Sequence, residues 1–255
     1  MNAEALFDSL AADYEQHFAA PHRRAYDLLA WEITSARLPD DRVARVLDIG
    51  CGIGRWAERL LDLGHTVVGI EPAPAMANAA RSRLADRHGF ELIEQRVEDI
   101  ADAGGTFDLI LAMGSLQYCD DPPAVVRSAA PWLCPGGSIA VLVDSCAALV
   151  VELLRAGDTN QAIERAGTHR GCWRQGDRSA AMHLFDRRSL TGVFADAGLH
   201  HVRAYGLLVG ATVWGRDELA RRLNDEPDHL EVERQLANVE AIADLGKQLL
   251  VVGGR

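Results

Sequence analysis

The feature that most constrains this chain is a run of three glycines at alternate positions, placed directly after a short apolar segment. Residues 45–49 are predicted to form a buried strand, and Gly50, Gly52 and Gly54 follow it before a helical pattern begins at residue 55. Glycine has no Cβ, so a ligand can approach the backbone closely at such a turn. The order of strand, glycine turn and helix therefore predicts a nucleotide-like ligand at this place.

Strands and helices alternate along much of the rest of the chain. Such alternation is typical of a mostly parallel sheet with helices on both faces. Further strands are expected at 66–70, 90–93, 107–112, 138–143, 198–208 and 248–252, with a Pro-Gly-Gly turn at 135–137. Helices are expected at 55–63, 73–87, 122–133 and 187–197. The pattern predicts a doubly wound α/β fold with seven strands.

Three segments lie outside this core pattern. Apolar residues at helical spacing, broken at Pro21, predict two helices before the first strand. Residues 145–186 are longer than a crossover needs, and loops of that length are usually functional. We expect a single domain, divided into N-terminal helices at 1–43, a cofactor-binding core at 44–144, and two substrate-side insertions at 145–186 and 209–246, the second helical and rich in charge.

Composition limits the partners and the compartment of the chain. A chain of 255 residues, 48% of them apolar, can bury one sizeable core. The net charge of −11 repels polyanions, which disfavours nucleic acid as a partner. No apolar window is long enough to cross a membrane, and the first residues do not resemble a signal peptide, so we expect a cytoplasmic protein. The five scattered cysteines are interpreted as reduced thiols.

Two acidic residues distinguish among adenosine cofactors. Glu71 ends the strand at 66–70, where an acid can accept hydrogen bonds from both ribose hydroxyls of an adenosine. A dinucleotide fold places its third glycine where this chain has Arg55. Asp48, just before the glycines, suits a cofactor with positive sulfonium and ammonium groups better than one with a pyrophosphate. These features favour a positively charged cofactor over NAD.

Four segments resemble the class I S-adenosylmethionine-dependent methyltransferases, particularly the ubiquinone-biosynthesis-like group. They are VLDIGCGIG at 46–54, GIEPAPAM at 69–76, FDLIL at 107–111 and LCPGG at 133–137. The resemblance covers roughly residues 6–143 and the final strand. It implies S-adenosylmethionine as the cofactor, a Rossmann-like sheet, and an N-terminal helical lid.

The same resemblance implies a set of cofactor-binding residues. Ribose would be held by Glu71, and the N-terminal lid would bind the cofactor's carboxylate through a tyrosine and an arginine, here Tyr14 and Arg24, with Arg23 as the competing choice. Many relatives carry an acid where this chain has Arg96, which shifts the expected adenine contact to Glu98 or to backbone. The remaining expected contacts are Gly50, Cys51 and Gly52 at the methionine part, Pro72, Met76, Val97 and Glu98 at the adenine, and Ala112 and Met113 beside the sulfonium.

Candidates for the acceptor side come from the loop after residues 107–112 and from the segment 145–186. Tyr118 could orient an acceptor through its phenol, or could serve only in packing. The segment 145–186 holds polar and aromatic residues that could line a pocket: Asn160, His169, Arg170, Trp173, Arg174 and His183. Among them His183 is the preferred general base, with a structural histidine as the alternative. No histidine or carboxylate cluster has metal-ligand spacing, so we expect no metal.

The acceptor itself is predicted only by class. Methyl transfer needs mainly positioning and exclusion of water, so the sequence need not carry a conspicuous catalytic group. We expect methylation of an oxygen or nitrogen of a small molecule, in secondary metabolism. The layout also resembles the enzymes that esterify carboxymethoxyuridine in tRNA, and a relative that binds the cofactor without methylating is a further alternative.

Overall fold

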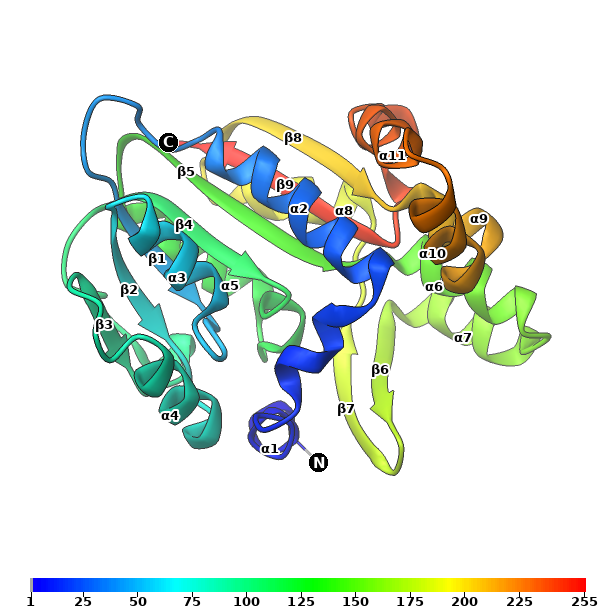
Figure 1. Cartoon of the computed structure of the whole chain (residues 1–255), viewed down its shortest axis with the longest axis horizontal. Helices are drawn as coiled ribbons and strands as arrows, with labels where there is room; N and C mark the ends of the chain where they lie inside the picture. The colour runs from blue at the N-terminus through cyan, green and yellow to red at the C-terminus, as the bar shows by residue number, and fades with distance from the viewer. Residues whose placement is uncertain (1) are drawn as a thin grey trace.

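A seven-stranded sheet forms the centre of the molecule (Figure 1). The structure, a computed structural model, describes residues 2–255, and the side chains of all of these except His17 and Gln175. The strands are β1 (Arg45–Ile49), β2 (Thr66–Ile70), β3 (Phe90–Ile93), β4 (Phe107–Met113), β5 (Leu133–Asp144), β8 (His200–Leu207) and β9 (Gln248–Gly254), in the spatial order β3-β2-β1-β4-β5-β9-β8. Strand β9 runs in the opposite direction to the other six strands of this sheet. This confirms the predicted mostly parallel α/β fold.

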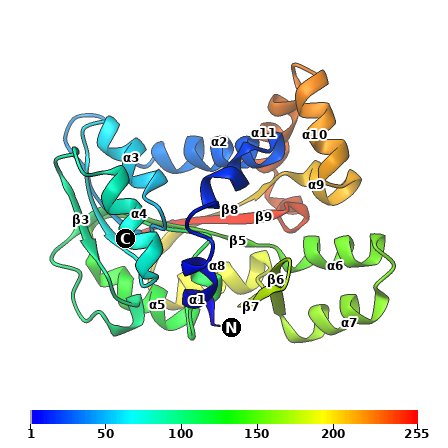
Figure 2. The ribbon, with the colours of Figure 1, turned by 60° about the horizontal axis from the view of Figure 1, so that its bottom comes forward.

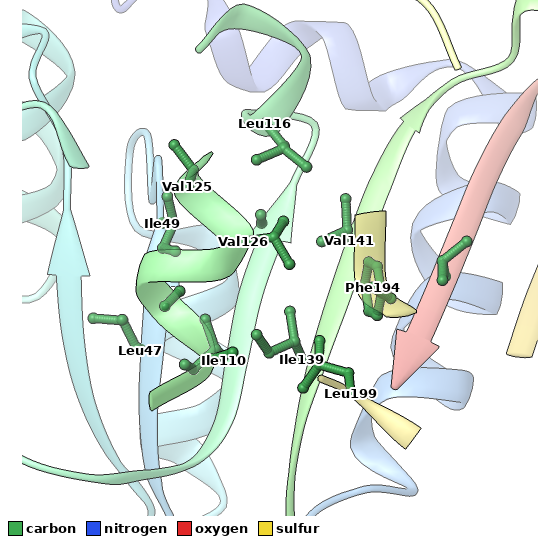
Figure 3. Packing of buried hydrophobic residues seen from close by; sticks show 14 of the residues in the cluster. Leu47, Ile49, Ile110, Leu116, Val125, Val126, Ile139, Val141, Phe194 and Leu199 are labelled. Carbon is green, nitrogen blue, oxygen red and sulfur yellow. The ribbon is translucent and has the colours of Figure 1, made fainter. Parts of the chain in front are cut away.

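Helices cover both faces of the sheet because neighbouring strand residues point to opposite sides. On one face, α5 (Pro122–Ala129) and α8 (Arg187–Asp196) pack on a core that includes Leu47, Ile110 and Phe194 (Figure 3). On the other face, α2 (Pro21–Ser35) and α3 (Arg55–Asp62) cover Val46 and Leu109. Figure 2 shows α2 and α3 above the sheet and α5 and α8 below it.

Several element boundaries differ from those predicted. The helix expected at 73–87 is α4 (Pro74–Arg83), and the one expected at 122–133 ends as α5 at Ala129, followed by a 3-10 turn, η4 (Ala130–Trp132). Strand β5 begins at Leu133, so the turn expected at 135–137 lies within it, where the pairing with β4 shifts register. A bulge takes up the Pro-Gly-Gly segment without ending the strand.

The segment 145–186 is not a long irregular loop. It folds into α6 (Cys146–Arg155), α7 (Thr159–Thr168) and an antiparallel hairpin of β6 (Arg170–Gln175) and β7 (Arg178–His183). Figure 1 shows the hairpin extending beyond the main sheet toward the N-terminal helix α1 (Ala3–Asp8). Helix α1 packs against both α4 and β7.

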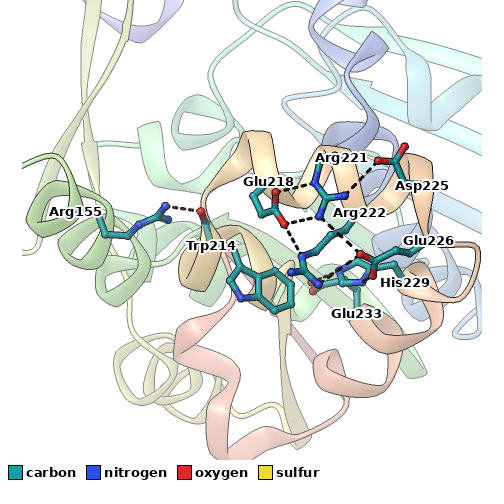
Figure 4. A network of polar contacts seen from close by, with 9 residues as sticks. All are labelled: Arg155, Trp214, Glu218, Arg221, Arg222, Asp225, Glu226, His229 and Glu233. Carbon is teal, nitrogen blue, oxygen red and sulfur yellow. Dashed lines mark hydrogen bonds and ion pairs between the residues drawn. The ribbon is translucent and has the colours of Figure 1, made fainter.

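The second insertion is helical, as expected, and is rich in ion pairs (Figure 4). It comprises α9 (Val209–Trp214), α10 (Arg216–Asp225), α11 (His229–Ala237) and η5 (Glu240–Leu245). Glu218 accepts hydrogen bonds from Arg221 and Arg222, and His229 lies beside Glu226 and Glu233. No helix in residues 2–255 is long and apolar enough to cross a membrane.

Candidate functional site

The glycine turn after β1 has a left-handed backbone at three positions. The φ angles of Gly50, Gly52 and Gly54 are 70°, 56° and 79°, values that other residues rarely adopt. A Cβ on Gly50 would overlap the Cβ of Ser115, and a Cβ on Gly54 would lie 3.0 Å from Leu84 Cδ1. A Cβ on Gly52 would meet nothing within 4 Å. Packing therefore requires glycine at the first and third positions, and the space beside the second is open.

Glu71 connects this turn to the end of β2. Its carboxylate is 6% exposed and accepts the Gly52 N–H on Oε2 and the Ala73 N–H on Oε1, both at 2.9 Å. Burial raises the pKa of this carboxyl. Each carboxylate oxygen can accept a second hydrogen bond. The side chain thus fixes the turn and still offers acceptors to a ligand.

Asp48 is a second buried acid at this end of the sheet. Its Oδ2 has no hydrogen-bond partner among the described residues, and burial, followed by the charge of Glu71, raises the pKa of Asp48 to about 7. Asp48 lies on β1, behind the turn. A buried carboxylate without a partner is costly, and a nearby positive charge would stabilise it.

A first cavity, of about 170 Å³, opens at the carboxyl ends of β1, β2 and β4, where the strand order reverses and open α/β sheets hold ligands. Ten of the predicted site residues line it: Tyr14, Gly50, Gly52, Glu71, Pro72, Met76, Val97, Glu98, Met113 and Tyr118. Cys51 and Ala112 do not line it. Both are buried in the core, with Cys51 Sγ packed against Gly69. For these two residues the predicted ligand contact is not supported.

One side of this cavity holds an ion-pair bridge that the sequence did not indicate. Arg96 Nη2 lies 2.6 Å from Oδ2 of Asp120 and 3.2 Å from Oε1 of Glu98. Glu98 lies on the short 3-10 turn η2 (Val97–Asp99). Glu98 also accepts the Asp120 N–H at 3.0 Å. Arg96 thus holds Glu98 and the loop at Asp120 together.

The N-terminal segment covers the first cavity with aromatic rings. Phe7 of α1 contacts Tyr118 edge to face, with ring centroids 5.1 Å apart, and lies 6.3 Å from the ring of Tyr14. Burial raises the pKa of both phenols, so both are neutral near pH 7. Phe7 was not predicted as a site residue, although it lies in the segment that resembles a lid.

Arg24 does not lie where it was predicted. Its side chain is exposed and lines neither of the cavities described here. Arg23 precedes it on α2 and lines a second, larger cavity. One residue along a helix turns the side chain by about 100°, which separates the two arginines. The structure therefore does not support a contact between Arg24 and the cofactor's carboxylate.

The second cavity, of about 610 Å³, lies between the two insertions and α2. Its polar and charged lining comprises His22, Arg23, Asp144, Glu152, Gln161, Arg165, Arg174, Arg216, Lys247 and Gln248. Its apolar and aromatic lining includes Tyr26, Leu149, Leu153, Trp173, Met182, Leu208 and Ala211. Of the residues expected to line a pocket from the segment 145–186, only Trp173 and Arg174 do so.

His183, the predicted general base, lines neither cavity. Met182 lines the second cavity, and its neighbour on β7 points to the opposite side of the hairpin. His183 Nε2 lies 2.9 Å from Arg170 Nη1, and burial and this arginine lower the pKa of the imidazole. The structure does not support the role predicted for His183.

Aromatic side chains lie between the two cavities. Tyr14 and Tyr118 line the first cavity and Trp173 lines the second, and all three pack on one apolar cluster that includes Leu6 and Met76. Tyr118 and Trp173 also pack together with Met182. The two cavities are therefore neighbours at one edge of the sheet. In the described part of the chain, no three histidine, cysteine or acidic side chains are grouped as a metal site.

Comparison with known proteins places this geometry in context. A family model described as a methyltransferase domain matches residues 20–204. The ubiquinone biosynthesis O-methyltransferase of Xanthomonas axonopodis pv. citri (strain 306) is 39% identical over 110 residues, which are 42% of this chain and 46% of that protein. The match thus spans less than half of this curated relative.

Solved structures of low sequence identity share the fold over nearly the whole chain. A SAM-dependent methyltransferase from Thermotoga maritima has a TM-score of 0.60 and 19% identity, and the match covers 98% of both chains. The DhpI-SAM-HEP complex has a TM-score of 0.61 and 16% identity, and the match covers 98% of this chain and 94% of that one. At these identities the likeness shows the fold alone.

Proposed function

The chain belongs to the class I S-adenosylmethionine-dependent methyltransferases, and from this premise we propose that it methylates an oxygen or nitrogen of a small molecule held in the second cavity. The observation that carries the proposal is the pairing of two neighbouring cavities at the carboxyl edge of one sheet. One contains the glycine turn and Glu71, and the other has a mixed polar and apolar lining.

The residues of the first cavity fit the cofactor. The open space beside Gly52 and the spare acceptor capacity of Glu71 suit the ribose and the methionine part. Asp48 is buried behind the glycine turn and does not line the cavity, so its carboxylate would act on a positively charged ligand only through its field. Met76, Pro72, Val97 and Glu98 would border the adenine, Met113 the sulfonium, and Tyr14 the carboxylate end.

S-adenosylmethionine supplies a methyl group that its sulfonium activates for in-line displacement. The protein's own contribution is to orient the acceptor and to keep water away from it. Phe7, Tyr14 and Tyr118 would exclude water from the junction of the cavities, since their rings pack together there. The phenols of Tyr14 and Tyr118 are neutral near pH 7 and could orient an acceptor atom by hydrogen bonding.

Asp144 is our candidate for holding the proton-bearing group of the acceptor. It ends β5 and lines the second cavity, and its Oδ2 accepts a hydrogen bond from Gln117 Nε2 at 3.2 Å. No cation lies within ion-pair distance of it in the described part of the chain. Its N–H donates a hydrogen bond to Gln117 Oε1 at 2.7 Å, so Asp144 lies beside the residue that precedes Tyr118. A hydroxyl or an amine could donate to this carboxylate.

The arginines that could have contacted tRNA are largely engaged within the protein. Arg170 contacts His183, and Arg178 donates a hydrogen bond to the carbonyl of Ser9 at 2.9 Å. Together with the net charge of −11, this favours a small acceptor over tRNA.

The test is a turnover assay with S-adenosylmethionine and a panel of phenols, alcohols, amines and carboxylic acids, with total tRNA as a separate arm. S-adenosylhomocysteine release is the readout. We expect release with a small molecule and loss of release in Asp144→Asn, with unchanged binding of S-adenosylhomocysteine. Release only with tRNA would contradict the proposal, and so would tight cofactor binding with no release from any arm.

A further inference from the structure

The second cavity is cationic although the protein as a whole is acidic. Five cationic side chains and two carboxylates line it, in a chain whose net charge is −11. The cations are Arg23, Arg165, Arg174, Arg216 and Lys247, and the carboxylates are Asp144 and Glu152. Lys247 is the only lysine of the chain. Such a local reversal of charge favours an anion inside this cavity.

The carboxylates do not neutralise all of these cations. Glu152 pairs with Lys247 at 2.5 Å and with Arg216 at 2.8 Å. Arg165 pairs with Glu164 at 3.2 Å. Across residues 2–255, no described carboxylate forms an ion pair with Arg23 or Arg174. These two guanidinium groups, one from α2 and one from β6, are available to a ligand.

Two buried polar atoms of the lining also have no partner among the described groups. They are Nδ1 of His22 and Oε1 of Gln248. Burial, followed by the charges of Arg23 and Arg216, lowers the pKa of His22, so its ring is neutral near pH 7. Buried polar atoms nearly always have hydrogen-bond partners. A ligand with a hydroxyl or amide group would supply them.

The rest of the lining suits an apolar body. Leu149, Leu153, Met182 and Leu208 contribute aliphatic or thioether surface, and Trp173 contributes an aromatic ring. Burying an apolar ligand surface here would favour binding, because it removes apolar area from water. The cavity therefore combines apolar surface with uncompensated positive charge.

We propose that the methyl acceptor is an amphipathic anion, whose carboxylate or phosphate binds Arg23 and Arg174 while its apolar body lies against Leu149, Leu153 and Trp173. This rests on the proposed function, which makes the second cavity the acceptor site. Arginine is suited to this role because its fork of donors matches both anions in a bidentate manner. A polar group of the same ligand forms hydrogen bonds with Nδ1 of His22 and Oε1 of Gln248.

A matched pair of fluorescent probes tests the charge requirement. The probes are 8-anilinonaphthalene-1-sulfonate, which is anionic, and N-phenyl-1-naphthylamine, its neutral analogue. In Arg23→Gln/Arg174→Gln we expect the affinity for the anionic probe to fall about tenfold, as for lost charge-assisted hydrogen bonds, and the affinity for the neutral probe to be retained. Arg127→Gln, an exposed arginine on α5 outside both cavities, is the control and should change neither affinity.

A further variant locates the probes. Ala156 is exposed at the rim of the second cavity, so Ala156→Trp should fold normally and weaken binding of both probes. Phenylacetate and phenyl phosphate should displace the anionic probe, and the stronger of the two identifies the anionic group, whereas neutral 2-phenylethanol should not displace it. An unchanged affinity for the anionic probe in the double variant, or equal displacement by the neutral alcohol, would overturn the proposal.

Calorimetric titration with S-adenosylhomocysteine separates this inference from the proposed function. All variants should bind it as the wild-type protein does, because none of the substituted residues lines the first cavity. If the wild-type protein did not bind S-adenosylhomocysteine, the proposed function would be wrong. The result with the two probes would still decide whether the cavity selects anions.

Discussion

At the scale of single residues, Glu71 has two roles. It fixes the turn through the N–H groups of Gly52 and Ala73, and it offers acceptors to the first cavity. We expect Glu71→Ala to weaken binding of S-adenosylhomocysteine by about 1.5–3 kcal/mol, the range for hydrogen bonds to a charged group. Calorimetric titration measures this.

Glu91→Ala is the matched control, because Glu91 is an exposed acid on the neighbouring strand β3. Its affinity for S-adenosylhomocysteine should equal that of the wild-type protein. Glu71→Gln keeps the side-chain shape but loses the charge, so its affinity for S-adenosylhomocysteine should lie between those of Glu71→Ala and Glu91→Ala. Equal affinities for all the variants would exclude Glu71 from the ribose contact.

Asp48 provides a pH-dependent prediction. Its pKa of about 7 in the folded protein is above the ordinary value of 3.8, so between about pH 4 and 7 the folded state binds more protons than the unfolded state. Its contribution to the free energy of unfolding therefore falls as pH rises through this window. Relative to Asp48→Asn, the wild-type protein should lose about 2.5–3 kcal/mol of stability between pH 5 and 8.

Denaturant unfolding at several pH values measures this difference. Asp177→Asn, on the exposed turn of the hairpin, is the control and should follow the wild-type curve, because Asp177 lies at the surface and not in the core. If the Asp48→Asn and wild-type proteins instead lost stability in parallel, Asp48 would not titrate in this range.

The residue scale also shows what the sequence could predict. Residues on backbone that the motifs define, such as Gly52, Glu71 and Met113, line the first cavity together, and their contacts with the cofactor stay a prediction. Arg24 and His183 were misplaced because a side chain's direction depends on where its helix or strand packs. One position along α2 or β7 decides between the second cavity and another surface.

At the scale of elements, the chain offers two helical glycines with opposite surroundings. A Cβ on Gly210 in α9 would overlap Glu233 Oε1 and lie 2.8 Å from Trp214 Cζ3, whereas a Cβ on Gly192 in α8 would meet nothing within 4 Å. Gly210→Ala should therefore lower the free energy of unfolding by about 1–3 kcal/mol through overpacking. Gly192→Ala should raise it by about 0.5–1 kcal/mol by restricting the unfolded chain.

Denaturant unfolding of the two variants measures this contrast, and each serves as the control for the other. Stabilisation of both would show that α9 can move away from Glu233 at little cost. Destabilisation of both would show that α8 has no room for a methyl group.

Elements of the core were predictable because each is specified locally. Strands β1, β2 and β3 have the predicted bounds, since each is a short apolar run between turn residues. The hairpin β6–β7 was not predicted, because its strands are specified by contacts with α1 and with the loop at Tyr118 rather than by their own alternation. A pocket was expected from this segment, but only Trp173 and Arg174 of the six expected residues line it.

At the scale of the whole molecule, the fold joins distant parts of the chain at one edge of the sheet. The first cavity combines the N-terminal helix with the ends of β1, β2 and β4, and the second cavity adds both insertions. A ligand that binds only this assembled edge stabilises the entire folded state. The alternation of strands and helices predicted the sheet, whereas the meeting of α1 with β7 depends on tertiary packing.

This assembly gives a prediction for thermal unfolding. S-adenosylhomocysteine at one hundred times its Kd should stabilise the folded protein by about 2.7 kcal/mol, which raises the Tm of a chain of this size by about 5–10 °C. NAD at the same concentration should leave the Tm unchanged, because the glycine spacing and the Asp48 carboxylate oppose a pyrophosphate. Differential scanning calorimetry measures both. An equal rise with NAD would mean that the first cavity recognises only the adenosine, and that Asp48 plays no part in selecting a positively charged cofactor.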